Sequence, residues 1–330
     1  MADRLKLLRQ WLQEDLNLTG FSIAPASEDA SFRRYFRISW KQETAIVMDA
    51  PPERENCAPF LDITARLLAG KVNVPAVRAR SLSAGFLLLD DLGTQLYLDV
   101  LTAENADRLY ADAIAALLRM QDQVEVGGLP AYDEKLLRQE MSLFGDWLLD
   151  RHLHLRISPA MQKMLEAAVA LLIRSALEQP RVFVHRDYHS RNLLLNPRLN
   201  PGIVDYQDAV HGPITYDLVS LLKDCYIKWP RVKVLGWARD YYDRCRLIAG
   251  AGLSHDQFLR WFDLMGVQRH LKASGIFARL LHRDNKTGFT RDIPRTLSYI
   301  LDLEEFYPEL SPLAGLIRER VLPGLEQPRT

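Results

Sequence analysis

Three side chains close together in the sequence are of the types that transfer a phosphoryl group. Asp187 and Asn192 lie in the string VHRDYHSRN (184–192), and Asp205 follows about a dozen residues later in IVDY (203–206). An aspartate can accept the proton of an attacking hydroxyl, and amide and carboxylate oxygens are ligands that Mg²⁺ prefers beside substrate phosphates. The pattern therefore predicts Asp187 as the catalytic base. Asn192 and Asp205 are predicted to hold a Mg²⁺ ion that binds the β- and γ-phosphates of a nucleotide.

Three further polar residues of this string serve either the chemistry or the shape of the loop. His189 and Arg191 lie between the expected base and the expected metal ligand, where a cation would neutralise charge on the transferring group. We expect His189 to contact the nucleotide and Arg191 to contact the acceptor, although a structural role fits each of them equally well. His185 is expected to form hydrogen bonds with backbone groups and to hold the loop in shape.

The segments that must position these residues change in character along the chain. Near the N-terminus, β-forming residues predict a hairpin over 32–40 and 44–48 and two more strands over 77–81 and 86–89. Farther along, apolar stripes at helical spacing predict mainly helices, which short strands interrupt beside the catalytic string. The predicted helices span 3–16, 53–71, 103–124, 133–152 and 158–179, with more after 217, and the short strands span 182–184, 193–195 and 203–204.

This order of segments predicts an α+β fold with two lobes, like that of protein kinases. A small β-sheet lobe over residues 1–92 and a larger, mainly helical lobe over 93–330 would be joined near 89–93. A chain of 330 residues is long for a single core, which also favours two lobes. A nucleotide is expected in the cleft between them.

Composition excludes several kinds of partner. Lysine plus arginine equal aspartate plus glutamate, 42 against 42, so charge gives no reason to expect nucleic acid or an anionic membrane. The three widely spaced cysteines contain no CxxC pair and fit reduced thiols. The N-terminus lacks a signal-peptide core, and the apolar runs are far shorter than the roughly 20 residues that span a bilayer. We therefore expect a cytoplasmic protein, with a monomer as the default state.

The catalytic segments resemble those of a known superfamily. Residues 185–192 and 203–206 are similar to the signature of the aminoglycoside phosphotransferases and choline kinases, and GPITYDL (212–218) fits that family's structural aspartate, here Asp217. Within the superfamily the chain resembles the bacterial anomeric sugar kinases that phosphorylate N-acetylmuramate and N-acetylglucosamine at C1. The resemblance implies ATP as the donor and a product that enters peptidoglycan recycling. The stretches that match this branch are SFRRYFR (31–37), IVMDAPPE (46–53), LLLDDLG (87–93), DYQDA (205–209) and QRHLK (268–272).

The N-terminal lobe departs from the kinase pattern at its phosphate loop. Residues 24–36 contain no glycine, so backbone amides near Ser31 and Phe32 would have to bind phosphate without glycine's conformational freedom.

A second departure is the absence of the strand lysine that normally pairs with the α- and β-phosphates, since residues 45–48 contain none. An arginine on the neighbouring strand is expected to replace it, although a solvent-facing position fits any one arginine equally well. Strand alternation would put Arg33 and Arg37 on one face and Arg34 on the other. The candidates are Arg33, Arg34 and Arg37, with Glu53 or Glu55 as the acidic partner.

The connector between the lobes is expected to contact ATP. In the resembled family such a segment offers backbone groups to the adenine edge, which here would come from Leu89, Asp90 and Asp91. The two aspartates are alternatively ordinary polar residues of a turn, or they bind ribose or acceptor hydroxyls.

Charge near the C-terminus bears on the acceptor. Residues 260–295 carry eight lysines and arginines against three aspartates, and in the resembled family helices of this region wall the acceptor pocket. A polycationic aminoglycoside needs acidic walls, whereas the lactyl carboxylate of N-acetylmuramate suits an arginine. A solvated basic face would explain these residues as well. The expected acceptor contacts are Arg191, Gln207, Asp208, Arg269, His270 and Arg279.

Two other functions remain open from the sequence. The same chemistry would serve another alcohol, such as choline, homoserine, an aminoglycoside or a different sugar. Alternatively, the missing lysine and glycines favour a pseudokinase that binds nucleotide without turnover. The intact set of Asp187, Asn192 and Asp205 argues against that second reading, because a binding-only site needs no base.

Overall fold

The structure is a computed structural model that describes residues 2–28, 32–250 and 252–326. Ser31, predicted above to contact ATP, lies outside the described residues. Within those ranges no helix combines the length and the hydropathy that crossing a membrane would require.

The chain divides into two compact units. Unit 1 comprises Met1–Leu96 and Asn192–Asp208, and unit 2 comprises Tyr97–Arg191 and Ala209–Thr330. The chain thus returns to unit 1 at Asn192, the last residue of the string 184–192. The lobe boundaries expected at residues 92 and 93 stay a prediction.

A five-stranded antiparallel sheet in the order β1-β2-β3-β5-β4 is the centre of unit 1. The predicted hairpin is present, with Arg34 of β2 opposite Asp49 of β3. Apolar side chains of β2, β3 and β5 pack against Leu8, Trp11 and Leu12, so the N-terminal amphipathic segment covers one face of the sheet. The strands are β1 (Ser22–Glu28), β2 (Arg34–Trp40), β3 (Glu43–Asp49), β4 (Val77–Ser81) and β5 (Phe86–Asp90).

The helices of unit 1 are α1 (Ala2–Gln10), its π-helical continuation η1 (Trp11–Asp15), and α2 (Ala58–Ala69). α2 holds the returning segment of the chain. The ring of Tyr206 stacks on Phe60 with centroids 5.3 Å apart, and its hydroxyl lies 2.9 Å from Thr64 Oγ1. These contacts explain why the residues around Tyr206 belong to unit 1.

A small hairpin places the two expected metal ligands. β7 (Leu193–Leu194) pairs antiparallel with β8 (Gly202–Ile203) around the turn predicted between them. Asn192 immediately precedes β7 and Asp205 closely follows β8. Both residues therefore lie at the open end of the same hairpin, where Val204 N also donates to Asn192 O at 3.1 Å.

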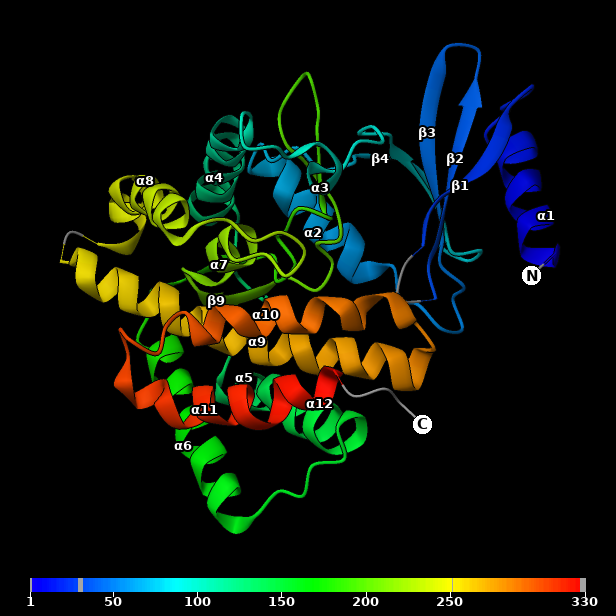
Figure 1. Cartoon of the computed structure of the whole chain (residues 1–330). Helices are drawn as coiled ribbons and strands as arrows, with labels where there is room; N and C mark the ends of the chain where they lie inside the picture. Colours follow the sequence, from blue (N-terminus) through cyan, green and yellow to red (C-terminus); the bar gives the residue numbers. More distant parts are fainter. Residues whose placement is uncertain (1, 29–31, 251, 327–330) are drawn as a thin grey trace. The chain divides into compact units, whose positions relative to one another are not determined.

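Unit 2 is mainly helical and is organised around α9 (His255–Asp284), a helix of 30 residues that other helices pack on (Figure 1). A two-stranded sheet of β6 (Arg181–Val184) and β9 (Val210–Pro213) leads into and out of the catalytic segments. The other helices are α3 (Tyr97–Val100), α4 (Ala106–Gln123), α5 (Glu134–Leu143), η2 (Phe144–His152), α6 (Pro159–Leu177), α7 (Tyr216–Leu222), α8 (Arg231–Ala249), η3 (Thr287–Asp292), α10 (Ile293–Leu301), η4 (Pro308–Leu310), α11 (Ser311–Leu316), η5 (Ile317–Val321) and α12 (Leu322–Glu326).

Two sequence-based expectations of local structure were wrong, and two strands, β1 and β9, were not predicted. The helix expected from residue 53 begins only at Ala58, because residues after Pro51 form a turn and the side chain of Asn56 accepts a hydrogen bond from Ala58 N. The strand expected from residue 32 begins at Arg34, so Arg33 precedes it and does not share a strand face with Arg37. β9 was missed because its sequence, VHGP, shows no apolar alternation and contains glycine and proline.

Candidate active site

In unit 2, a buried aspartate holds the loop that carries the candidate base Asp187. Asp217, in the first turn of α7, accepts hydrogen bonds from His185 N at 2.6 Å and from Arg186 N at 3.0 Å. Burial raises the pKa of Asp217 to about 7, although the two N–H donors and nearby Arg269 favour its ionised form. The loop is also strained, since Arg186 has a φ of 78°, a region that bulky side chains rarely adopt. These contacts agree with the structural role expected of Asp217.

His185 contributes to the same backbone arrangement. It is completely buried, and its Nδ1 accepts a hydrogen bond from Asp187 N at 3.2 Å. The ring therefore shapes the turn that carries the candidate base.

The carboxylate of Asp187 reaches solvent from this fixed loop. Its side chain is 42% exposed, and Arg269 Nη1 lies 3.8 Å from its Oδ1. Desolvation of the carboxylate opposes its ionisation, but the positive charges of Lys272, Arg269, His189 and Arg186 hold the pKa of Asp187 well below its usual range. Asp187 is therefore ionised at neutral pH and can accept a hydrogen bond from an alcohol.

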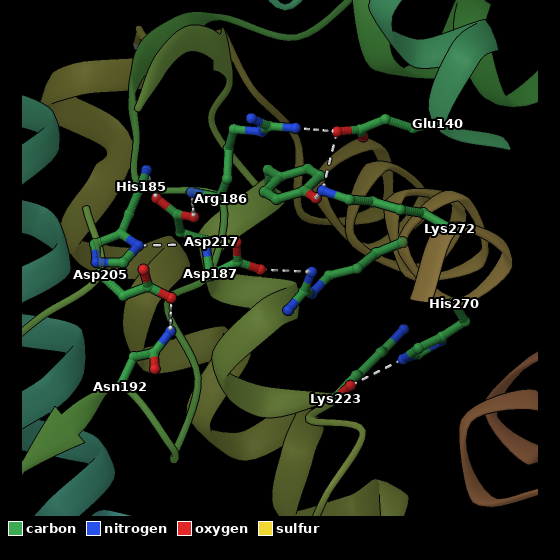
Figure 2. Close-up of polar contacts among 12 residues, drawn as sticks. Glu140, His185, Arg186, Asp187, Asn192, Asp205, Asp217, Lys223, His270 and Lys272 are labelled. Carbon is green, nitrogen blue, oxygen red and sulfur yellow. Dashed lines mark hydrogen bonds and ion pairs between the residues drawn. The ribbon is translucent and has the colours of Figure 1, made fainter. Parts of the chain in front are cut away.

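Glu140 holds two of these cations and was not anticipated from the sequence. It lies in α5, is 5% exposed, and accepts hydrogen bonds from Arg186 and Tyr132. Lys272 Nζ lies 3.0 Å from its Oε1 and also donates to Tyr216 Oη at 2.9 Å. Figure 2 shows Glu140 between Arg186 and Lys272. The available signal was a glutamate on the apolar face of a helix, where an unpaired charge would be costly.

Asp224 is a second unanticipated carboxylate, and it holds the far end of the loop. It is 2% exposed and accepts hydrogen bonds from Ser190 N at 2.9 Å and Ser190 Oγ at 2.5 Å. Burial lowers the pKa of His189, whereas the charges of Asp224 and Asp187 raise it. The loop is thus tied at both ends, to Asp217 and to Asp224.

In unit 1, Asn192 and Asp205 lie side by side as the sequence predicts. Asn192 Nδ2 is 3.2 Å from Asp205 Oδ2 (Figure 2). Gln207 Nε2 donates to Asp205 Oδ1 at 2.8 Å. Asp205 is exposed and has a φ of 67°. An exposed carboxylate beside an amide oxygen fits Mg²⁺, which uses one or two protein ligands together with substrate phosphates. The groups that contact the Asp205 carboxylate are the uncharged side-chain amides of Asn192 and Gln207, which a cation can displace.

The three candidate arginines of unit 1 each have a different acidic partner. Arg33 Nε lies 3.2 Å from Glu55 Oε2. Glu55 is one of the two glutamates expected to pair with the arginine. Phe32 N donates to the same carboxylate at 3.0 Å. Glu53 is exposed. The Arg33–Glu55 pair therefore lies immediately beside the segment expected to bind phosphate.

The other two arginines are bound within the sheet. Arg34 pairs with the fully buried Asp49, which Arg4 of α1 also contacts. Arg37 Nε lies 2.7 Å from Asp91 Oδ2, and its Nη2 donates to Gly93 O at 2.8 Å. Both side chains therefore hold parts of unit 1 together.

The connector aspartates are engaged in the same way. Asp90 Oδ1 accepts from Arg78 Nε at 2.6 Å, and Leu89 is buried in β5. Burial opposes ionisation of Asp91, but hydrogen bonds from Arg37 and Gly93 N lower its pKa. These contacts favour a structural role for both carboxylates over direct ligand binding.

The expected acceptor residues fall into distinct environments. Arg269 lies beside Asp187 and is 5% exposed, with its Nε lacking a hydrogen-bond partner in the described part of the chain. His270 is 1% exposed, stacks on Tyr299 and has its Nε2 2.8 Å from Lys223 O, so it belongs to the core of unit 2. Arg279 lies ten residues beyond Arg269 on α9, about 15 Å along the helix axis, too far to share one carboxylate with it. Of the remaining three, Arg191 is exposed in unit 2, Gln207 contacts Asp205, and Asp208 is exposed in unit 1.

Comparisons with known proteins agree with this geometry. The profile of the phosphotransferase enzyme family matches residues 22–248. A protein of Pseudomonas putida named N-acetylmuramate/N-acetylglucosamine kinase is 46% identical over 330 residues, which cover 96% of each chain.

Solved structures show the same fold at low sequence identity. The ADP-bound aminoglycoside phosphotransferase APH(2'')-Ib matches with a TM-score of 0.59 at 14% identity, covering 90% of this chain and 97% of that one. The choline kinase LicA from Streptococcus pneumoniae matches with a TM-score of 0.63 at 10% identity, covering 89% and 98%. The predicted α+β fold, with an N-terminal sheet and a larger helical part, is confirmed, as is the predicted superfamily.

Proposed function

Because the chain belongs to the phosphotransferase enzyme family, we propose that it transfers the γ-phosphoryl group of ATP to the anomeric C1 hydroxyl of N-acetylmuramate and N-acetylglucosamine. The observation that carries this proposal is the ionised carboxylate of Asp187, which reaches solvent from a loop that Asp217 and Asp224 hold in place. The relative from Pseudomonas putida, similar over nearly its whole length, supports the choice of sugar.

In the proposed reaction Asp187 orients the sugar hydroxyl and takes up its proton. The sugar oxygen forms a bond to the γ-phosphorus while the bond from that phosphorus to the bridging oxygen breaks, which releases ADP. A carboxylate of low pKa accepts the proton late, and most of the acceleration comes from positioning and charge neutralisation. Arg269, 3.8 Å from Asp187, supplies a fixed positive charge beside the reacting oxygen.

For the nucleotide, Asn192 and Asp205 are the proposed Mg²⁺ ligands. A bound Mg²⁺ supplies positive charge that offsets the charge of the phosphates. We assign the role of the missing lysine to Arg33 with Glu55, because Arg34 and Arg37 are held by other carboxylates.

Two further contacts with the nucleotide are proposed. The backbone near Leu89 would meet the adenine edge, and His189 would face the phosphates. The proposed substrates are a small amino sugar and ATP. We place the reaction in the cytoplasm, where ATP is available, with the sugar 1-phosphate passing to cell-wall recycling.

The test is phosphorylation of a panel of amino sugars, choline and aminoglycosides by the full chain with Mg·ATP, with the new phosphate located by phosphorus NMR. We expect a C1 phosphate on the two N-acetyl sugars. Asp187→Asn should lower turnover by about 10²- to 10⁴-fold with little change in ATP affinity. Asp150→Asn, at an exposed position of unit 2, is the matched control. Wild-type turnover in Asp187→Asn would show that this residue is not the base.

A further inference from the structure

Arg191 is an exposed arginine held against two aromatic rings of unit 2. Its guanidinium carbon lies 4.8 Å from the ring centroid of Tyr226 and 5.2 Å from that of Phe289. Phe277 of α9 supports both rings, with centroids 6.0 Å from Tyr226 and 5.8 Å from Phe289. We call these three rings the aromatic clamp. Stacking restricts the guanidinium, so less conformational entropy is lost when its N–H groups bind a ligand.

The aromatic clamp and the catalytic loop share one anchor. Asp224 accepts hydrogen bonds from Tyr226 N at 2.8 Å and, through its other oxygen, from Ser190 N at 2.9 Å. Ser190 directly precedes Arg191, and the ring of His189 lies 5.4 Å from that of Tyr226. Arg191 is therefore held at a fixed place relative to Asp187, four residues before it in the loop.

Arg191 also differs from the neighbouring cations in its charge partners. Arg186 and Lys272 are both bound to Glu140, and Arg269 lies next to Asp187. Across the residues that the structure describes, no carboxylate forms an ion pair with Arg191, which contacts the two rings and donates a hydrogen bond to the Tyr226 side chain. A guanidinium has five N–H donors, so several remain for an anion beside the bond to Tyr226, and a carboxylate can accept two of them at once.

We infer that Arg191 binds the lactyl carboxylate of the acceptor and so sets the preference for N-acetylmuramate over N-acetylglucosamine. This inference rests on the proposed function. The two sugars differ by the lactyl ether at C3, two ring atoms away from the C1 that carries the reacting hydroxyl. Arg269 is placed at the reacting oxygen by its proximity to Asp187, whereas Arg191 is available for a group farther along the sugar.

The first test is the ratio of kcat/KM for N-acetylmuramate to that for N-acetylglucosamine. In Arg191→Gln this ratio should fall about 10- to 100-fold, because a charge-assisted pair is replaced by a neutral contact. Phe289→Leu removes one ring and should lower the ratio by about 3- to 10-fold. Arg283→Gln, an exposed arginine of α9 that pairs with its neighbour Asp284, should leave the ratio unchanged.

A substrate-side control separates carboxylate binding from other effects. With the neutral methyl ester of N-acetylmuramate, wild type and Arg191→Gln should differ by less than about threefold, since no carboxylate is left to recognise. If Arg191→Gln lowers kcat/KM equally for both sugars, Arg191 acts on the transferred phosphoryl group or on the loop, and the inference is overturned. If Arg191→Gln changes kcat/KM for neither sugar, the inference is overturned as well.

The same experiment distinguishes this failure from failure of the proposed function. If the wild-type protein phosphorylates neither sugar, the proposed function is wrong and the assignment of Arg191 falls with it. If the wild type phosphorylates both and the ratio does not move in either variant, only the assignment of Arg191 is wrong.

Discussion

Replacing Glu140 by glutamine should strongly destabilise unit 2, although glutamine has nearly the same shape as glutamate. The substitution leaves Lys272, 6% exposed, and Arg186, 21% exposed, without their shared carboxylate. Breaking a buried ion pair by removing one partner costs roughly 3–5 kcal/mol. The glutamine carbonyl can still accept a hydrogen bond from Lys272, and Arg186 is partly exposed to solvent. We therefore expect the free energy of unfolding to fall by about 3 kcal/mol, near the lower end of this range.

The measurement is urea-induced unfolding at 25 °C, with Glu134→Gln as the matched control on the same helix. Glu134 pairs with Arg138, and both side chains are more than half exposed. Glu134→Gln should therefore lower the free energy of unfolding by less than about 0.5 kcal/mol. Adding Lys272→Met to Glu140→Gln should recover about 1–2 kcal/mol, because one uncompensated buried charge is removed. If Glu140→Gln is as stable as the control variant, or if the double variant recovers nothing, this account of the network is wrong.

Three further predictions concern single residues. Burial and nearby cations lower the pKa of His270 to about 3, so between pH 6.5 and 3 the native state binds fewer protons than the unfolded chain and becomes less stable as the pH falls. When the pH is lowered from 7.5 to 5, the free energy of unfolding measured in urea should fall by about 2 kcal/mol more in wild type than in His270→Gln. The variant His154→Gln, at an exposed position, should show the same pH dependence as wild type. Gly85→Ala should lower the thermal midpoint by several degrees, since its φ is +73° and a Cβ would lie 1.9 Å from Ala50 O, while Gly236→Ala, with open space around it in α8, should not lower it. Asp224→Asn should lower kcat about tenfold in the sugar-kinase assay with the fold intact by circular dichroism, and an unchanged kcat would contradict its positioning role.

The parts of the site that the sequence could predict are those whose geometry is local. Asn192 and Asp205 meet because a short hairpin joins them, and the apolar pairs and turn that make this hairpin are legible in the sequence. The hairpin of β2 and β3 and the amphipathic first helix were predicted for the same reason. Such contacts follow from residue spacing and turn chemistry alone.

Partners that come from distant segments could not be predicted in this way. Glu140 is 46 residues from Arg186, and Asp224 is 34 residues from Ser190, so nothing in the local pattern connects them. The carboxylates that hold Arg34 and Arg37 also come from distant segments, and β2 begins two residues after its predicted start. Moving that boundary transferred Arg33 from the strand to the loop beside Glu55.

The charge of residues 260–295 shows why composition misleads about acceptor binding. Its excess of lysine and arginine suggests a basic wall, yet Lys272 and Arg269 are buried and are balanced by carboxylates from other segments, Glu140 and Asp187. A buried cation requires such a partner, so part of the apparent excess along the sequence is balanced by acids from other segments. Selectivity for an acidic sugar then depends on a cation that is accessible and lacks an acid of its own. In this loop Arg191 meets both conditions among the described residues, and therefore the predicted effect of Arg191→Gln is a change in sugar preference rather than a general loss of affinity for anions.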